Sequence, residues 1–185
     1  MMILTTIKES NILVTGPPGC GKSTLIEKVV KRIEGPATGF FTREIQERGR
    51  RIGFSITTLD GRKGVLAHQN IMSQFRVGKH GINIEDIDSL AVSAMIPAQR
   101  EQVIIIDEIG KMECFSALFK KTLIQVFDSV NFVIGSIALK GDHFIQQIKE
   151  RSDVLLINVS VQNHNILIDQ ILDSIKKLNA KKTYL

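Results

Sequence analysis

The sequence predicts an α/β protein of three layers, in which helices cover both faces of a mainly parallel sheet. Short apolar runs typical of buried strands alternate with segments of helical periodicity along most of the chain. A glycine-rich segment joins the first apolar run to the first helical segment, and a later apolar run ends in two adjacent carboxylates. Since ligands of open parallel sheets bind beyond the carboxyl ends of the strands, both polar segments are expected to lie at one site.

The glycine-rich segment has the pattern of a phosphate-binding loop. A strand is predicted at residues 12–14, and the helical pattern that follows has apolar positions from Leu25 to Ile33. Between them, residues 16–23 fit G-x-x-x-x-G-K-[ST], in which backbone N–H groups and a helix N-terminus bind phosphate oxygens. The residues expected to bind the phosphates are Gly16, Pro17, Pro18, Gly19, Cys20, Gly21, Lys22, Ser23 and Thr24.

Individual residues of this loop have distinct expected roles. Lys22 is expected to reach the β- and γ-phosphates and to act in catalysis, while the Ser23 hydroxyl holds Mg²⁺. Pro17 and Pro18 have no N–H to donate, so the closest donors are expected from residues 19–24. Cys20 is interpreted as filling a variable loop position, with a redox role as the alternative, because a helix N-terminus lowers a thiol pKa.

The second apolar run, residues 103–106, consists of β-branched aliphatics and predicts a central strand buried on both faces. Asp107 at its end is expected to hold Mg²⁺ directly or through water. The adjacent Glu108 can orient and deprotonate a water molecule, which favours hydrolysis. The alternative is that Glu108 only begins a solvated loop.

The segment between these two motifs predicts an antiparallel hairpin insertion over about residues 38–68. Gly35-Pro36 ends the first helix, and strands are expected at residues 38–45, 51–59 and 63–68. The last two strands are joined by Asp60-Gly61, a strong hairpin signal. Next, Asn83 is expected to cap a helix at about residues 84–95, and Pro97 to kink or end it.

After Asp107 the alternation resumes and continues to the end of the chain. Helices are expected near residues 115–127, 142–149 and 164–178. Strands are expected at residues 131–137 and 153–159. Because no linker, repeat or low-complexity tract interrupts the pattern, residues 1–185 are interpreted as a single domain.

Composition excludes several classes of protein. Apolar residues make up 43% and charged residues 23%, which is typical of a soluble globular protein. No segment is recognisable as a membrane span, and residues 1–6 do not have the pattern of an export signal. Cys20 and Cys114 do not form a disulfide framework, so a reducing cytoplasm is expected. The net charge of +5 is dispersed and the chain has no tryptophan, so nucleic-acid binding is not supported, although it stays open.

Three segments carry a resemblance to a known family. Residues 107–113, Asp-Glu-Ile-Gly-Lys-Met-Glu, resemble the signature of the thermophile-type and cancer-related nucleoside-triphosphatases. Residues 39–45 with 49–54 are similar to that family's second conserved region, and residues 81–83 to a third. The resemblance extends from about residue 11 to residue 175. It implies a P-loop NTPase domain that hydrolyses ATP, GTP and other nucleoside triphosphates with Mg²⁺ and little base selectivity.

The resemblance also implies site residues. By carry-over, residues 16–24 bind the phosphates, and the catalytic side of the nucleotide site is lined by Asp107, Glu108, Ile109 and Gly110. Independently of the family, Gly110 allows a sharp turn that brings Lys111 and Glu113 near the site, where Lys111 pairs with Glu108, approaches the γ-phosphate or stays on the surface. The chain departs from the family at residues 162–165, where His164 stands in place of the usual arginine.

The expected reaction is in-line attack of water on the γ-phosphate of ATP, GTP, CTP or UTP. An arginine that stabilises the transition state is expected from the hairpin insertion, and the candidates are Arg43, Arg50 and Arg51, each of which could instead be a solvated strand residue. Two other functions stay open. One is a small-molecule or nucleotide kinase, with the insertion as acceptor lid, and the other is a nucleotide-switched module that binds RNA or protein. Oligomeric state and activating partners are not indicated.

Overall fold

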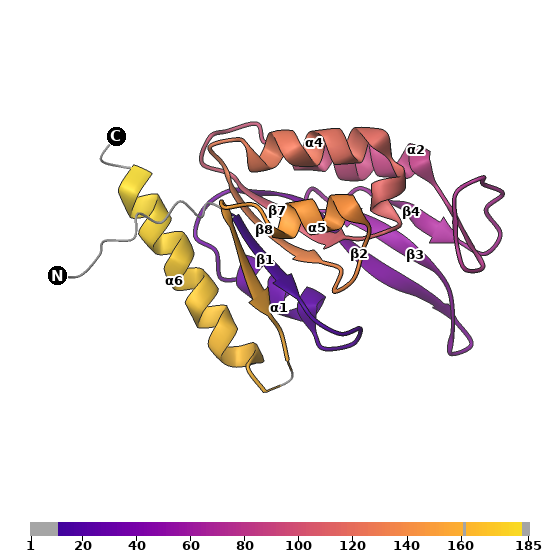
Figure 1. Cartoon of the computed structure of the whole chain (residues 1–185), viewed down its shortest axis with the longest axis horizontal. Coiled ribbons are helices and arrows are strands. Elements are labelled where there is room, and N and C mark those ends of the chain that lie inside the picture. Colours follow the sequence, from indigo (N-terminus) through magenta and orange to yellow (C-terminus); the bar gives the residue numbers. More distant parts are fainter. Residues whose placement is uncertain (1–10, 161, 183–185) are drawn as a thin grey trace.

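The computed structural model describes residues 11–160 and 162–182 of the chain. Within these residues the strands form one nine-stranded sheet in the order β5-β6-β4-β3-β2-β7-β8-β1-β9 (Figure 1). Its parallel core consists of β1 (Asn11–Thr15), β2 (Ala37–Glu47), β7 (Val103–Ile109), β8 (Phe132–Ile137) and β9 (Val154–Asn158). Its antiparallel extension consists of β3 (Arg50–Thr58), β4 (Lys63–His68), β5 (Arg76–Val77) and β6 (His80–Ile82).

Helices cover both faces of the sheet, as predicted. One face carries α1 (Lys22–Val30) and α6 (His164–Lys182). The other face carries α2 (Ile84–Asp86), η1 (Ile87–Val92), α3 (Ser93–Met95), α4 (Ala117–Phe127) and α5 (His143–Lys149) (Figure 1). A short 3₁₀ turn, η2 (Glu113–Phe115), follows β7. Ile104 and Ile105 belong to the apolar clusters on opposite faces, which confirms that β7 is buried on both sides.

The predicted hairpin does not form a separate layer, because β2 joins it directly to the parallel core. The first half of β2 pairs with β7 in parallel register, from Ala37↔Val103 to Phe41↔Asp107. Its second half pairs with β3 in antiparallel register, and the Asp60-Gly61 turn connects β3 to β4 as expected. One long strand therefore carries residues from the middle of the sheet past the end of β7, toward the carboxylates.

The helix predicted at residues 84–95 is present, although its middle six residues, Ile87–Val92, are π-helical. The Asn83 side chain accepts the N–H of Asp86, which confirms the predicted cap, and the helix ends at Met95, just before Pro97. The short hairpin of β5 and β6 was not predicted from the sequence. It forms at the edge of the sheet, where β6 pairs with only two residues of β4, Ala67 and His68.

The ends of other helices differ from the prediction by a few residues. The first helix ends at Val30, short of Ile33, and the last continues beyond residue 178 to Lys182. The helix expected from residue 115 begins at Ala117, because the Ser116 side chain caps it by accepting the N–H of Phe119 at 2.9 Å.

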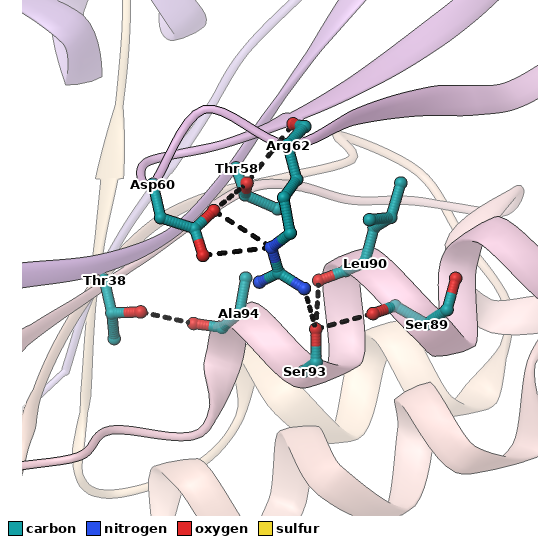
Figure 2. Close-up of polar contacts among 8 residues, drawn as sticks. All are labelled: Thr38, Thr58, Asp60, Arg62, Ser89, Leu90, Ser93 and Ala94. Atoms are coloured by element: carbon teal, nitrogen blue, oxygen red, sulfur yellow. Dashed lines mark hydrogen bonds and ion pairs between the residues drawn. The ribbon is translucent and has the colours of Figure 1, made fainter.

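Polar contacts join the hairpin to the helical layer, as Figure 2 shows. Arg62 donates from Nε to Asp60 at 2.9 Å and from Nη1 to the Ser93 hydroxyl at 3.0 Å, and the Thr38 hydroxyl donates to the Ala94 carbonyl at 2.8 Å (Figure 2). The hydrogen bond from Arg62 is the main reason that the pKa of Asp60 is lowered to about 2, so the exposed Asp60 carboxylate stays ionised at neutral pH. These contacts attach the start of β2 and the β3–β4 turn to α3.

None of the helices in the described part of the chain has the length and apolar character that a membrane crossing requires. Residues 1–6, on which the expectation of no export signal partly depends, lie outside the described residues.

Candidate active site

The phosphate-loop motif lies between β1 and α1, the context that the sequence predicted. Gly21 has a φ of 93° and caps α1, and Gly19 has a φ of 78°, so both positions use backbone conformations that favour glycine. The Nζ of Lys22 donates to the carbonyls of Gly16 at 3.0 Å and Pro17 at 3.3 Å. The Lys22 side chain thus folds back over the start of the loop, and its ammonium group lies beside the first two loop carbonyls.

The sheet order brings the two sequence motifs together. β8 lies between β1 and β7, so the phosphate loop and the carboxylates stand at the same end of three neighbouring parallel strands. β7 extends to Ile109, three residues further than predicted, so Asp107 and Glu108 lie inside the strand and not after it. The Asp107–Glu108 peptide bond is cis.

Asp107 is completely buried, and its two oxygens have different surroundings. Oδ1 accepts a hydrogen bond from the Ser136 hydroxyl of β8 at 2.5 Å. Oδ2 has no hydrogen-bond partner among the described residues and lies 3.9 Å from Nη1 of Arg43. Burial raises the pKa of Asp107, while the nearby hydroxyls of Ser136 and Ser23 and the positive charges of Arg43 and Lys22 oppose the rise.

These donors fit a magnesium ion. The two predicted ligands, Ser23 and Asp107, are close enough to interact, and Oδ2 is a buried oxygen left without a partner. The described residues contain no group of three or more His, Cys, Asp or Glu side chains able to hold a metal ion. Mg²⁺ binds through few protein oxygens and keeps waters or substrate phosphates as its other ligands, so one hydroxyl and one carboxylate oxygen fit it.

A cavity of about 540 Å³ opens between the phosphate loop, the first turns of α1 and the hairpin wall of β2 and β3. Its lining residues are Pro18, Gly19, Gly21, Lys22, Ser23, Thr24, Glu27, Thr42, Arg43, Glu44, Arg51, Phe54 and Glu108. A second cavity of about 390 Å³ shares Pro18, Lys22 and Glu108 with the first and reaches the loop after β8. Lys22 and Glu108 therefore border both spaces.

Two of the three candidate arginines line the larger cavity. Arg43 pairs with Glu27 of α1 as well as approaching Asp107. Arg51 is held by Glu44 across the hairpin, with Nη1 2.7 Å from Oε1. Arg50 is exposed and is not among the residues that line the cavity.

Known proteins resemble this chain over most of its length. A family model described as NTPase matches residues 11–172. This chain belongs to that NTPase family. It is 43% identical over 172 residues to the nucleoside-triphosphatase THEP1 of Thermotoga sp. strain RQ2, covering 92% of this chain and 98% of the relative. It is 35% identical to the human cancer-related nucleoside-triphosphatase, with 90% and 96% covered.

Solved structures of NTPase relatives have the same fold. The crystal structure of THEP1 from Aquifex aeolicus matches with a TM-score of 0.82 at 34% identity, covering 89% of this chain and 98% of that one. The solution structure of a human cancer-related nucleoside triphosphatase matches with a TM-score of 0.78, also at 34% identity. These matches confirm the resemblance and the fold class predicted from the sequence, and membership of the family makes the chain a nucleoside-triphosphatase, a hydrolase.

Three other residues that the sequence associated with the site of this NTPase differ in how far they are buried. Ile109 is fully buried in the apolar core, and Cys20 is partly buried and free. Lys111 is exposed, and the pairing with Glu108 that was one of its three expected positions is not among the ion pairs of the described site residues, which join Arg43 to Glu27 and Asp107 and Arg51 to Glu44.

The sequence did not point to some residues of this NTPase site. Ser136 is a lone hydroxyl inside an apolar strand, a signal that could have marked it. Glu27 and Phe54 carry no local signal, because the fold alone places them at the cavity. His164, which the sequence did single out, lies with Nε2 3.0 Å from the Gly21 carbonyl oxygen, so it joins α6 to the phosphate loop.

Proposed function

We propose that this NTPase hydrolyses ATP, GTP, CTP and UTP to the diphosphate and phosphate with Mg²⁺ and little base selectivity. One observation carries the proposal: Lys22, Ser23, Asp107 and Glu108 come from distant segments and meet at one end of the sheet, beside a cavity. The relatives' names specify a nucleoside-triphosphatase without specifying a base. A phosphate loop binds the part that all four substrates share, which supports base tolerance.

In this proposal, residues 16–24 hold the phosphates and the Lys22 ammonium leaves the loop carbonyls for the β- and γ-phosphates. Ser23 and Asp107 would hold the magnesium, which would neutralise phosphate charge when bound. The segment from Asp107 to Gly110 forms the catalytic side of the site.

Glu108 is proposed to orient the attacking water and to take its proton. Burial raises the pKa of Glu108, and the positive charge of Lys22 opposes the rise. A carboxylate whose pKa is raised toward neutrality is a stronger base while it remains ionised. Because Glu108 borders both cavities, a water beside it has an approach to the phosphate that Lys22 binds.

Arg43 is the arginine that we assign to the transition state. Arg43→Ala is expected to lower kcat by about a thousandfold or more, because an arginine that contacts the transferring phosphoryl group contributes ~10³-fold or more to kcat. Arg50 is the matched control, since it belongs to the same hairpin but does not line the cavity. Steady-state kinetics of Arg43→Ala and Arg50→Ala test the assignment, and equal kcat values for the two variants would contradict it.

Phosphate release from each of the four triphosphates, with Mg²⁺ and with excess EDTA, tests the function itself. We expect release from all four, with rates within about tenfold of one another, because the recognised phosphates are identical. Chelation should abolish release, since Asp107 Oδ2 and Ser23 would lose the ion that links them to the substrate. Release from a single triphosphate, or release that persists in EDTA, would refute the proposal.

Transfer to an acceptor is the second candidate, and the extent of the cavity favours it. The cavity continues past Glu108 to Thr42 and Phe54 on the hairpin wall, which leaves space for more than one water. Measuring ADP and free phosphate in parallel, with and without nucleoside monophosphates, separates the two reactions. Equal amounts indicate hydrolysis, whereas ADP in excess of phosphate indicates a kinase.

We also propose a single domain and a cytoplasmic location. The single nine-stranded sheet of the described residues supports one domain. The free thiols of Cys20 and Cys114 suit a reducing compartment.

A further inference from the structure

Glu113 is a buried carboxyl that the proposed mechanism does not use. Only 4% of the residue is exposed, and it begins the 3₁₀ turn that follows β7. Its Oε2 accepts the N–H of Gly110 at 3.1 Å, and the N–H of Cys114 donates to the Gly110 carbonyl at 3.1 Å. Both backbone polar groups of Gly110 are thus held by the turn that Glu113 begins.

Gly110 also brings Glu113 close to Glu108. A Cβ atom at Gly110 would lie 2.9 Å from Glu113 Oε2 and 3.5 Å from Glu108 Oε1, so the two carboxyl groups flank the same glycine. Between them, Ile109 is held by the N–H of Ala138, which donates to its carbonyl at 3.0 Å. The end of β7, which carries Glu108, is therefore held from two sides: by β8 through Ala138 and by the Glu113 turn through Gly110.

We propose that Glu113 is a positioning residue for Glu108: its buried carboxyl holds the Gly110 turn and thereby keeps Glu108 at the phosphate loop. The inference rests on the proposed role of Glu108 in hydrolysis. A displacement of about 1 Å at a catalytic group can cost on the order of a hundredfold in rate, so a residue that only holds a turn affects turnover.

The charge state of Glu113 follows from its surroundings. Burial, reinforced by the negative charges of Glu108 and Asp107 on β7, raises the pKa of Glu113 to about 8. Cys114, next in the turn, has a pKa raised to about 12 by burial and stays neutral. At neutral pH Glu113 therefore holds a proton and adds no negative charge beside the carboxylates that face the triphosphate.

Three variants test the inference. Glu113→Gln keeps an oxygen for the Gly110 N–H and resembles the protonated acid, whereas Glu113→Ala removes the contact. Cys114→Ala is the matched control, because it changes a buried side chain of the same turn that does not bind Gly110 through its side chain. For each variant, kcat and KM are measured from pH 6 to pH 9, and the binding of a fluorescent triphosphate analogue is measured separately.

We expect Glu113→Ala to lower kcat at pH 7 by at least about tenfold with little change in analogue binding, and Cys114→Ala to change kcat less than about threefold. Glu113→Gln should keep kcat within about threefold of the native value at pH 7. Above pH 8, ionised Glu113 adds a negative charge that opposes the triphosphate, so KM should rise in the native chain and not in Glu113→Gln. The inference would be overturned if Glu113→Ala kept the kcat of the native chain. It would also be overturned if KM of Glu113→Gln rose above pH 8 as much as KM of the native chain.

Thermal unfolding examines Glu113 without using activity. Between the ordinary pKa of 4.5 and the raised value of about 8, the native state holds a proton that the unfolded state releases, so stability falls as pH rises through this window. Tm of Glu113→Gln relative to native should therefore increase from pH 5 to pH 8. An unchanged difference would show that Glu113 is not held as a neutral acid. If Glu108→Gln kept full hydrolysis, the proposed function would fail, while the Tm comparison would still report on Glu113.

Discussion

Glu108→Gln is expected to lower kcat for phosphate release by about 10²–10⁴-fold while triphosphate binding persists, because the amide cannot accept the proton of the attacking water. The substitution preserves the size of the side chain and its place beside Lys22. In the proposed mechanism the phosphate loop supplies the binding energy, and the substitution leaves that loop unchanged. Steady-state release of phosphate gives kcat, and binding of a fluorescent analogue to the same preparation gives the affinity.

Glu44→Gln is the matched control for that experiment. It makes the same chemical change at another carboxylate of the same cavity, where Glu44 pairs with Arg51. We expect kcat of Glu44→Gln to stay within about threefold of native, because surface ion pairs contribute little. If Glu108→Gln released phosphate as fast as Glu44→Gln, Glu108 would not be the base.

Gly39→Ala is expected to reduce the free energy of unfolding by about 2–5 kcal/mol, combining overpacking with a strained backbone. Gly39 has a φ of 124° and pairs with Ile105 of β7. A Cβ atom there would overlap with the carbonyl oxygen of Ile105, a backbone atom that cannot move without breaking the sheet. Since small domains have only about 5–15 kcal/mol of stability, the loss would be a large fraction of the total.

Gly35 provides a matched control that separates the cost of backbone strain from the cost of the steric clash. Gly35 has a φ of 120°, close to that of Gly39, but a Cβ there has no atom within 4 Å. Gly35→Ala should therefore show only the conformational strain, about 1–2 kcal/mol. Urea unfolding of both variants measures the difference, which is the cost of the clash. Equal losses for the two variants would mean that β2 and β7 are not packed as closely as the structure has them.

The clash at Gly39 also connects stability to function. β2 is held to β7 by the pairing that includes Gly39 and Phe41, and Arg43 follows two residues later on the same strand. A shift of β2 away from β7 would carry Arg43 away from Asp107, so any Gly39→Ala protein that folds should also lose turnover.

Contiguous residues determined much of this molecule. The phosphate loop, the cap at Asn83 and the turn at Asp60-Gly61 each depend on the backbone preferences and side-chain hydrogen bonds of a few neighbouring residues, and the structure has all three. The sequence also placed Asp107 and Glu108 at the carboxyl end of a buried strand, because a run of β-branched aliphatics directly precedes them, although the structure continues the strand to Ile109.

Only the tertiary structure decided which distant residues meet. The insertion of β8 between β1 and β7 brings Ser136 to Asp107, and the shared pairing of β2 with β7 and β3 brings Arg43 to the same carboxylate. Burial turns Glu113 from an ordinary acid of the family signature into a neutral hydrogen-bonding group. Strand order and burial follow from how long-range apolar surfaces pack, and the pattern of neighbouring residues does not contain that information.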